Sequence, residues 1–236
     1  MKKHIPNIIT LLNLFSGTIA ITMAFQENFR AVVIWVSIAA LLDFLDGFAA
    51  RILKSYSDIG KQLDSLADVV SFGVAPAAAL FILLREFTLQ PELIGPIQIY
   101  TPYLAFLIPV FAAYRLAKFN IDHRQTESFL GLPTPANGLF WISYCYGIQT
   151  FAGNNEYLFY ITIVLIFIMS LLMISEIPMF SLKINKTGIK NNISQLILFL
   201  IAISLIVILG ISGLAWGIVA YIIISVLASS LKPSKG

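Results

Sequence analysis

Long runs of apolar residues, separated by short polar or Pro/Gly breaks, make up most of this chain. A helix crosses the hydrocarbon core of a membrane with about 20 apolar residues, so each such run predicts one span. Eight spans are predicted, at residues 6–25, 31–53, 62–84, 101–118, 134–151, 157–175, 194–210 and 212–231. The pattern therefore predicts an all-α, polytopic helical bundle in a membrane.

Composition agrees with this pattern. Of 236 residues, 58% are hydrophobic and 11% are charged, whereas a soluble domain has about 25% charged residues. The net charge of +3 is small and the basic residues are scattered, which argues against a nucleic-acid partner. The single cysteine, Cys145, cannot form an internal disulfide. Membrane lipid is thus the expected surrounding of the chain.

The basic residues predict an orientation. With eight spans the two termini share a side, and all but two of the 15 lysines and arginines fall on it. Only Arg30 and Arg85 fall on the other side. Because loops on the cytoplasmic side are rich in Lys and Arg, we expect cytoplasmic termini. A bacterial inner membrane is the simplest location.

Four aspartates interrupt the cytoplasmic halves of the second and third spans, although each costs about 2.5 to 3.5 kcal/mol at mid-membrane. Asp43 and Asp46 are three residues apart, and Asp64 and Asp68 are four apart. Each pair therefore lies on one face of its helix. The turn between the spans is short, which makes the two helices antiparallel neighbours, and we expect the four carboxylates to converge.

Converging carboxylates repel one another and must take up protons or bind a cation. Oxygen ligands without a nearby His or Cys are typical of Mg²⁺, Mn²⁺ or Ca²⁺. Small residues beside the aspartates, and Arg51 within one turn of Asp46, would leave room for a phosphate-bearing substrate. The alternative is a polar helix pair satisfied by internal hydrogen bonds, which would need as many donors as the four carboxylates have acceptors.

Residues 43–68 read DFLDGFAARILKSYSDIGKQLDSLAD, or D-x2-D-G-x2-A-R-x8-G-x3-D-x3-D. This segment resembles the signature of the CDP-alcohol phosphotransferases at every defined position. Members of that family have a six-helix core, and they transfer a substituted phosphoryl group from a CDP-linked donor to an alcohol, releasing CMP.

The resemblance implies a role for each signature residue. Two divalent ions, Mg²⁺ or Mn²⁺, would be held by Asp43, Asp46, Asp64 and Asp68, with Asp68 also acting as the catalytic base. The CDP pocket would be lined by Gly47, Ala50, Arg51 and Gly60. Similar Pro-Asn-x-x-Thr openings lie beside the nucleotide in the family, which adds Asn7 and Thr10. The alternative for this N-terminal polar face is hydrogen bonding between helices.

Three further stretches, residues 71–76, 114–120 and 129–137, resemble the phosphatidylserine synthase branch of the family, as does an extra C-terminal helix pair. This resemblance implies CDP-diacylglycerol as donor, L-serine as acceptor, and phosphatidylserine and CMP as products. A serine carboxylate needs a cation, which Arg115 can supply in a bidentate contact. Lys118, Thr134 and Asn137 are the further candidates for serine binding. The same stretches are also compatible with a kinked helix, membrane anchoring by Lys118, and a proline-rich helix start.

We expect residues 1–175 to form the six-helix core, and residues 176–236 to add a basic loop and a helix pair to the same membrane domain. The GxxxG of Gly213 and Gly217 is compatible with packing inside the bundle or with a homodimer. Glycerol 3-phosphate and inositol phosphate are alternative acceptors. A divalent-cation transporter is a more distant alternative, because it would place acidic residues toward both membrane faces.

Overall fold

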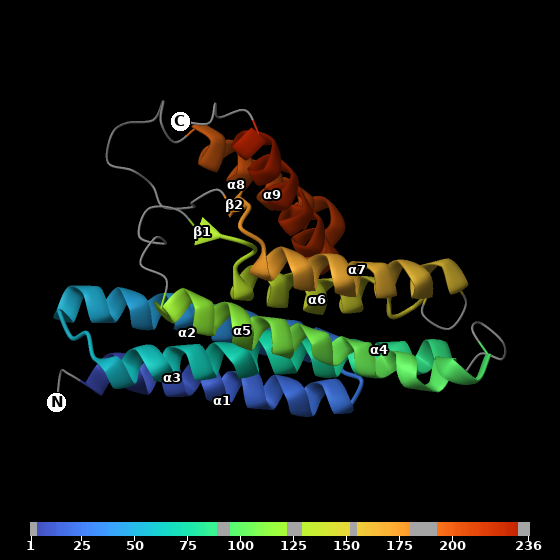
Figure 1. Ribbon diagram of the computed structural model, residues 1–236, viewed down its shortest axis with the longest axis horizontal. Coiled ribbons are helices and arrows are strands. Elements are labelled where there is room, and N and C mark those ends of the chain that lie inside the picture. The colour runs from blue at the N-terminus through green and yellow to red at the C-terminus, as the bar shows by residue number, and fades with distance from the viewer. Residues whose placement is uncertain (1–3, 89–94, 122–128, 152–154, 180–192, 231–236) are drawn as a thin grey trace.

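The computed structural model describes residues 4–88, 95–121, 129–151, 155–179 and 193–230. They are almost entirely helical, which confirms the predicted all-α bundle. The helices are α1 (Ile5–Phe25), α2 (Phe29–Leu53), α3 (Asp58–Asp68), η2 (Val69–Val74), α4 (Ala75–Thr88), η3 (Gly95–Phe106), α5 (Leu107–Ile121), α6 (Thr134–Ile148), α7 (Glu156–Ile174), α8 (Ile193–Leu209), η6 (Gly210–Ser212) and α9 (Gly213–Ser230). Figure 1 shows α1 to α7 running along one common direction, with α8 and α9 crossing them obliquely on one side.

Six stretches of the described residues are long and apolar enough to cross a membrane. They are Ile5–Phe25, Phe29–Leu53, Asp58–Phe87, Ile97–Ile121, Glu156–Ile174 and Leu200–Leu227. Eight spans were predicted, and the difference has two sources. The α6 helix has 15 residues, fewer than a span needs, and α8 and α9 fall within one stretch because only the 3₁₀ turn η6 separates them. The chain is a multi-pass membrane protein.

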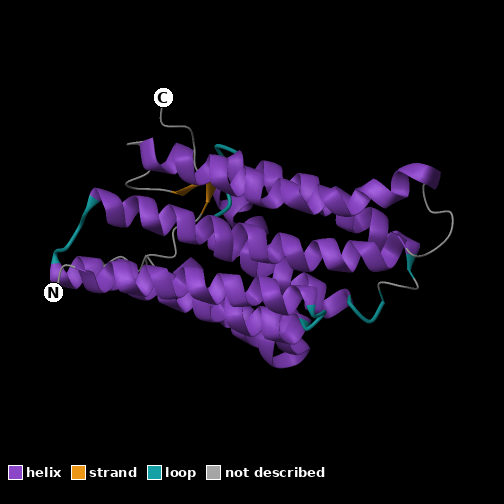
Figure 2. Cartoon of the chain, turned by 90° about the horizontal axis from the view of Figure 1, so that it is seen from below, coloured by secondary structure: helices purple, strands orange, loops and turns teal. Residues whose placement is uncertain are grey.

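Short polar segments set the antiparallel arrangement of α2 and α3. Lys54, with φ of 48°, ends α2 in the left-handed conformation. Ser57 begins α3 as its N-cap, since its Oγ accepts a hydrogen bond from the Gly60 N–H at 3.1 Å. Figure 2 shows these helices from below, as part of one layered bundle. The turn therefore brings the aspartates of the two helices to similar depth.

The third long helix runs without a break from α3 through η2 into α4, and η2 is a π-helical turn. Proline lacks an N–H, and its ring collides with the carbonyl four residues earlier in an α-helix. Here Pro76 follows η2, and the Ala75 N–H donates to the carbonyl of Val70, five residues back. The residues expected to kink the helix thus produce a π turn directly after Asp68.

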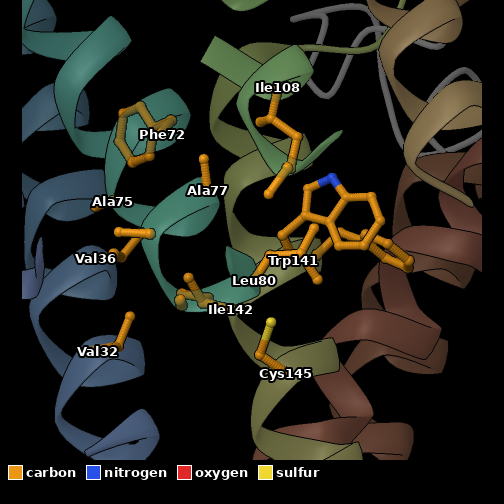
Figure 3. Close-up of a cluster of buried hydrophobic side chains, with 14 of the residues drawn as sticks. Val32, Val36, Phe72, Ala75, Ala77, Leu80, Ile108, Trp141, Ile142 and Cys145 are labelled. Atoms are coloured by element: carbon orange, nitrogen blue, oxygen red, sulfur yellow. The ribbon is translucent and has the colours of Figure 1, made fainter. Parts of the chain in front are cut away.

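The third helix is also the centre of the bundle. Within its membrane-length window 72% of the residues are buried, against 33% or less in the other five stretches. A run of alanines lets neighbouring helices approach it closely, and Figure 3 shows Ala77 and Leu80 between α2 and the helices that carry Ile108 and Trp141. Asp64 and Asp68 therefore stand on the most enclosed element of the protein.

A short backbone pairing fixes the start of α6. Strand β1 (Phe129–Leu130) pairs antiparallel with β2 (Pro178–Met179). The Gly131 N–H then donates to the Ile177 carbonyl at 3.0 Å, and the Leu132 N–H donates to the Leu172 carbonyl at 2.9 Å. The N-terminus of α6 is thereby tied to the end of α7.

Gly131→Ala is expected to destabilise this junction. Gly131 has φ of +72°, and an added Cβ would lie 2.5 Å from the Met173 carbonyl oxygen. The left-handed conformation alone costs a non-glycine residue about 1 to 2 kcal/mol. We expect a clear fall in the melting temperature of the detergent-solubilised protein. Gly47→Ala is the matched control, because its Cβ would meet nothing within 4 Å; equal melting temperatures for the two variants would contradict the prediction.

Gly213 and Gly217 lie at the contact between α9 and α8 of the same chain. A Cβ on Gly213 would collide with the Leu205 carbonyl oxygen, and one on Gly217 would lie 3.5 Å from Ala202 Cβ. Both glycines therefore let α9 pack closely on α8. A homodimer stays a prediction that does not need this motif.

The described basic residues divide between the two ends of the bundle as predicted. Lys61 Nζ donates to the Asn120 carbonyl at 2.7 Å, which joins the start of α3 to the end of α5. Arg30 and Arg85 lie at the start of α2 and near the end of α4, at the opposite end. Figure 1 places the start of α1 and the α2–α3 turn together at one end. Which end faces the cytoplasm stays a prediction.

Candidate functional site

The aspartates of α2 and α3 converge. Carboxylate oxygens of Asp43, Asp64 and Asp68 all lie within 4.8 Å of one another. Asp68 is only 6% exposed, and Asp43 and Asp64 are half-buried. The three residues come from two antiparallel helices. The two helix faces that carry the aspartates therefore meet in the structure, as predicted.

Asp46 lies beside this group of three but is turned toward α1. Its Oδ2 is 2.5 Å from Thr10 Oγ1, which is also 3.0 Å from the Pro6 carbonyl oxygen. A spacing of three residues leaves two side chains about 60° apart around a helix, and this offset separates Asp46 from Asp43. Asp46 still interacts electrostatically with the other three carboxyls. Its role as a metal ligand stays a prediction.

The three clustered carboxylates fit a hard divalent cation. All the donors are oxygens, the kind of ligand that Mg²⁺, Mn²⁺ and Ca²⁺ prefer. Asp68 Oδ1 is buried and has no hydrogen-bond partner among the described residues. A buried carboxylate oxygen without a partner is costly. A bound cation would supply the missing interaction.

The residues assigned to CDP lie on α1, α2 and α3. Asn7 Oδ1 approaches the start of α3 closely enough to lie 3.0 Å from a Cβ placed on Gly60. Gly47 faces open space, and its carbonyl accepts a hydrogen bond from Arg51 Nε at 3.0 Å. Ala50 is half-buried on the same helix. These residues and Thr10 are close to the aspartates, and their contacts with CDP stay predictions.

Three of the four residues assigned to serine are buried. Arg115 is 7% exposed, and its Nη1 donates to Thr134 Oγ1 at 3.1 Å. Arg115 also interacts electrostatically with Asp68. Thr134 and Asn137 are fully buried, and neither amide atom of Asn137 has a hydrogen-bond partner in the part of the chain that the structure describes. A buried guanidinium and an unsatisfied amide thus lie on α5 and α6, which both contact η2 just after Asp68.

Lys118 differs from these three. Its Nζ is 3.3 Å from Glu176 Oε1, and both side chains are partly exposed. This pair joins the end of α5 to the residues that follow α7. Serine binding by Lys118 stays a prediction, whereas membrane anchoring and this surface pair are compatible with its position.

The family model for CDP-alcohol phosphatidyltransferases matches residues 3–177, which include every one of the four aspartates. The chain belongs to this family. The resemblance seen in residues 43–68 is therefore confirmed, and the convergence of the aspartates is the arrangement that a family dependent on divalent cations requires.

Several curated relatives of this chain carry the same name. The chain is 34% identical over 157 residues to the CDP-diacylglycerol–serine O-phosphatidyltransferase of Bacillus subtilis, covering 64% of this chain and 78% of the relative. It is 35% identical to proteins of the same name from Methanocaldococcus jannaschii, covering 73% and 72%, and from Helicobacter pylori, covering 85% and 80%.

Two further residues lie near the site: Asn13, which the sequence places on one polar face with Asn7 and Thr10 but to which no role was assigned, and Tyr221, which sequence reasoning missed. Asn13 is fully buried beside Asp68, although neither amide atom has a hydrogen-bond partner of good geometry among the described residues. Its carbonyl accepts a hydrogen bond from Ser71 Oγ at 3.1 Å. Asn13 lies on the same helix face as Thr10, which was the available signal. Tyr221, on α9, interacts with Arg115, and its place in an apolar C-terminal run gave no signal.

Proposed function

We propose that this family member transfers the phosphatidyl group of CDP-diacylglycerol to the hydroxyl of L-serine, giving phosphatidylserine and CMP. The observation that carries the acceptor assignment is the buried guanidinium of Arg115 within electrostatic reach of Asp68. Serine is a small alcohol with a carboxylate. Arg115 would bind that carboxylate while the serine hydroxyl faces Asp68. The curated relatives described above carry the name of the same reaction.

The reaction uses Asp68 as general base. Its carboxylate takes the proton from serine Oγ, and the Oγ lone pair forms a bond to the phosphorus that bears diacylglycerol. The bond from that phosphorus to the oxygen of CMP breaks, and its electron pair leaves with CMP. Thr134 orients the Arg115 guanidinium through the hydrogen bond at 3.1 Å, and the Asn137 amide supplies a polar acceptor for the serine ammonium.

Asp43, Asp64 and Asp68 would hold the divalent cation, with Asp46 as a further ligand. When bound, the cation neutralises the diphosphate and stabilises CMP as leaving group. We propose Mg²⁺ or Mn²⁺, and two ions, since four carboxylates provide ligands for both. Ca²⁺ is compatible with the same oxygens.

The donor would lie with its acyl chains in the bilayer and its CDP group among Asn7, Thr10, Gly47, Ala50, Arg51 and Gly60. Because these residues lie at the basic end of the bundle, we propose that the active site and both termini face the cytoplasm in a bacterial inner membrane. We also propose that residues 1–175 form a six-helix core and that residues 176–236 form an added C-terminal part. Self-association into a homodimer is proposed as well.

The test is CMP release by the purified protein with CDP-diacylglycerol and Mg²⁺ or Mn²⁺. L-serine, glycerol 3-phosphate and inositol phosphate are compared as acceptors, and an arm with EDTA removes the cation. We expect release that requires both serine and the cation. Release with another alcohol would change the assigned acceptor from serine to that alcohol and leave the proposed type of reaction unchanged. Release that persists in EDTA would overturn the metal assignment, and release with no alcohol at all would overturn the transfer.

A further inference from the structure

The C-terminal helix α9 packs against α6 and against strand β2. Figure 3 shows the brown-red ribbon of the C-terminal pair beside the helix that carries Trp141. The same α6 helix begins with Thr134, the hydrogen-bond partner of Arg115. The C-terminal pair, which lies beyond the matched family region of residues 3–177, therefore reaches the wall of the proposed acceptor site.

One residue of α9, Tyr221, lies within electrostatic range of Arg115. It is 7% exposed, and its side chain interacts electrostatically with the guanidinium. Its hydroxyl is hydrogen-bonded to Ser225, which is 1% exposed and one turn further along the same helix. Buried tyrosine hydroxyls are usually held by such partners. Burial and this hydrogen bond thus hold the ring and hydroxyl of Tyr221 in place on α9.

We propose that Tyr221 is a positioning residue of the acceptor site, so that α9 completes the pocket in which the alcohol substrate binds. This inference rests on the proposed function, in which Arg115 binds the acceptor carboxylate. A guanidinium has five N–H donors in a planar fork, and a phenol hydroxyl can accept one of them while donating elsewhere. Tyr221 would hold the plane of the fork toward Asp68 and donate to the carboxylate of the acceptor.

Removing only the hydroxyl of Tyr221 should weaken acceptor binding and leave the donor site untouched, because the donor residues lie on α1, α2 and α3.

The experiment compares Tyr221→Phe with the wild-type protein by CMP release, at varied L-serine and at varied CDP-diacylglycerol. We expect the KM for L-serine to rise about tenfold, which is about 1.4 kcal/mol and lies at the lower end of what a hydrogen bond to a charged group contributes. The kcat and the KM for CDP-diacylglycerol should change less than twofold. Ser225→Ala should shift the KM for serine in the same direction by a smaller factor.

Tyr157→Phe is the matched control, because Tyr157 is 73% exposed on α7 and loses the same atom. A melting temperature for each variant separates loss of folding from loss of binding. An unchanged KM for L-serine, or a fall in kcat that is the same at varied L-serine and at varied CDP-diacylglycerol, would overturn the role of Tyr221. The Arg115→Lys variant would still test the proposed function separately. If another alcohol supports release, its KM is measured instead, and an unchanged value overturns the inference equally.

Discussion

Asp68→Asn is expected to lower serine-dependent CMP release by about a thousandfold, within the range of 10² to 10⁴ that general-base catalysis contributes. The amide has the shape of the carboxylate but cannot accept the serine proton. It also removes one negative charge from the three carboxylates whose oxygens lie within 4.8 Å of one another. Both consequences act on the same step, so this should be the largest effect of any single substitution.

The measurement is the initial rate of CMP release at saturating donor, serine and Mn²⁺, followed by a titration of the cation. Asp58→Asn is the matched control, since Asp58 is exposed at the start of the same helix and undergoes the same chemical change. We expect it to retain wild-type rates. An Asp68→Asn protein that keeps more than about a tenth of the wild-type rate would exclude Asp68 as the base.

Arg115→Lys should have the second-largest effect, a rise of about a hundredfold in the KM for L-serine. Lysine keeps the charge but loses the planar fork that grips a carboxylate with two hydrogen bonds. It also shortens the reach toward Thr134, whose hydroxyl accepts from Nη1 at 3.1 Å in the native protein. Losing one charged hydrogen bond costs about 1.5 to 3 kcal/mol, and each 1.4 kcal/mol is about tenfold.

The KM for CDP-diacylglycerol serves as the internal control for Arg115→Lys and should stay within about twofold of the wild-type value. Arg30→Lys makes the same change on an exposed residue at the other end of the bundle and should alter neither constant. Equal increases in both KM values would mean that the substitution disturbs the whole site, and no increase for serine would remove Arg115 from the acceptor site.

The sequence by itself determined the class of the protein and the identity of its central residues. Apolar runs of membrane length predict the helical bundle because a span has few other solutions in lipid. The spacing of Asp43, Asp46, Asp64 and Asp68 places each pair on one helix face, since helical periodicity is a local property. The short turn before Gly60 then makes the two helices neighbours. Neither step requires knowledge of any distant contact.

The tertiary structure decided how the helices are rotated against one another, which periodicity within one helix does not specify. That rotation groups three carboxylates and turns Asp46 toward Thr10, and it pairs Lys118 with a surface glutamate. It also brings Tyr221 within electrostatic range of Arg115, although more than 100 residues of chain lie between them. Packing of α9 on α6 determines that proximity, because side chains from separate helices approach one another only after the bundle has assembled.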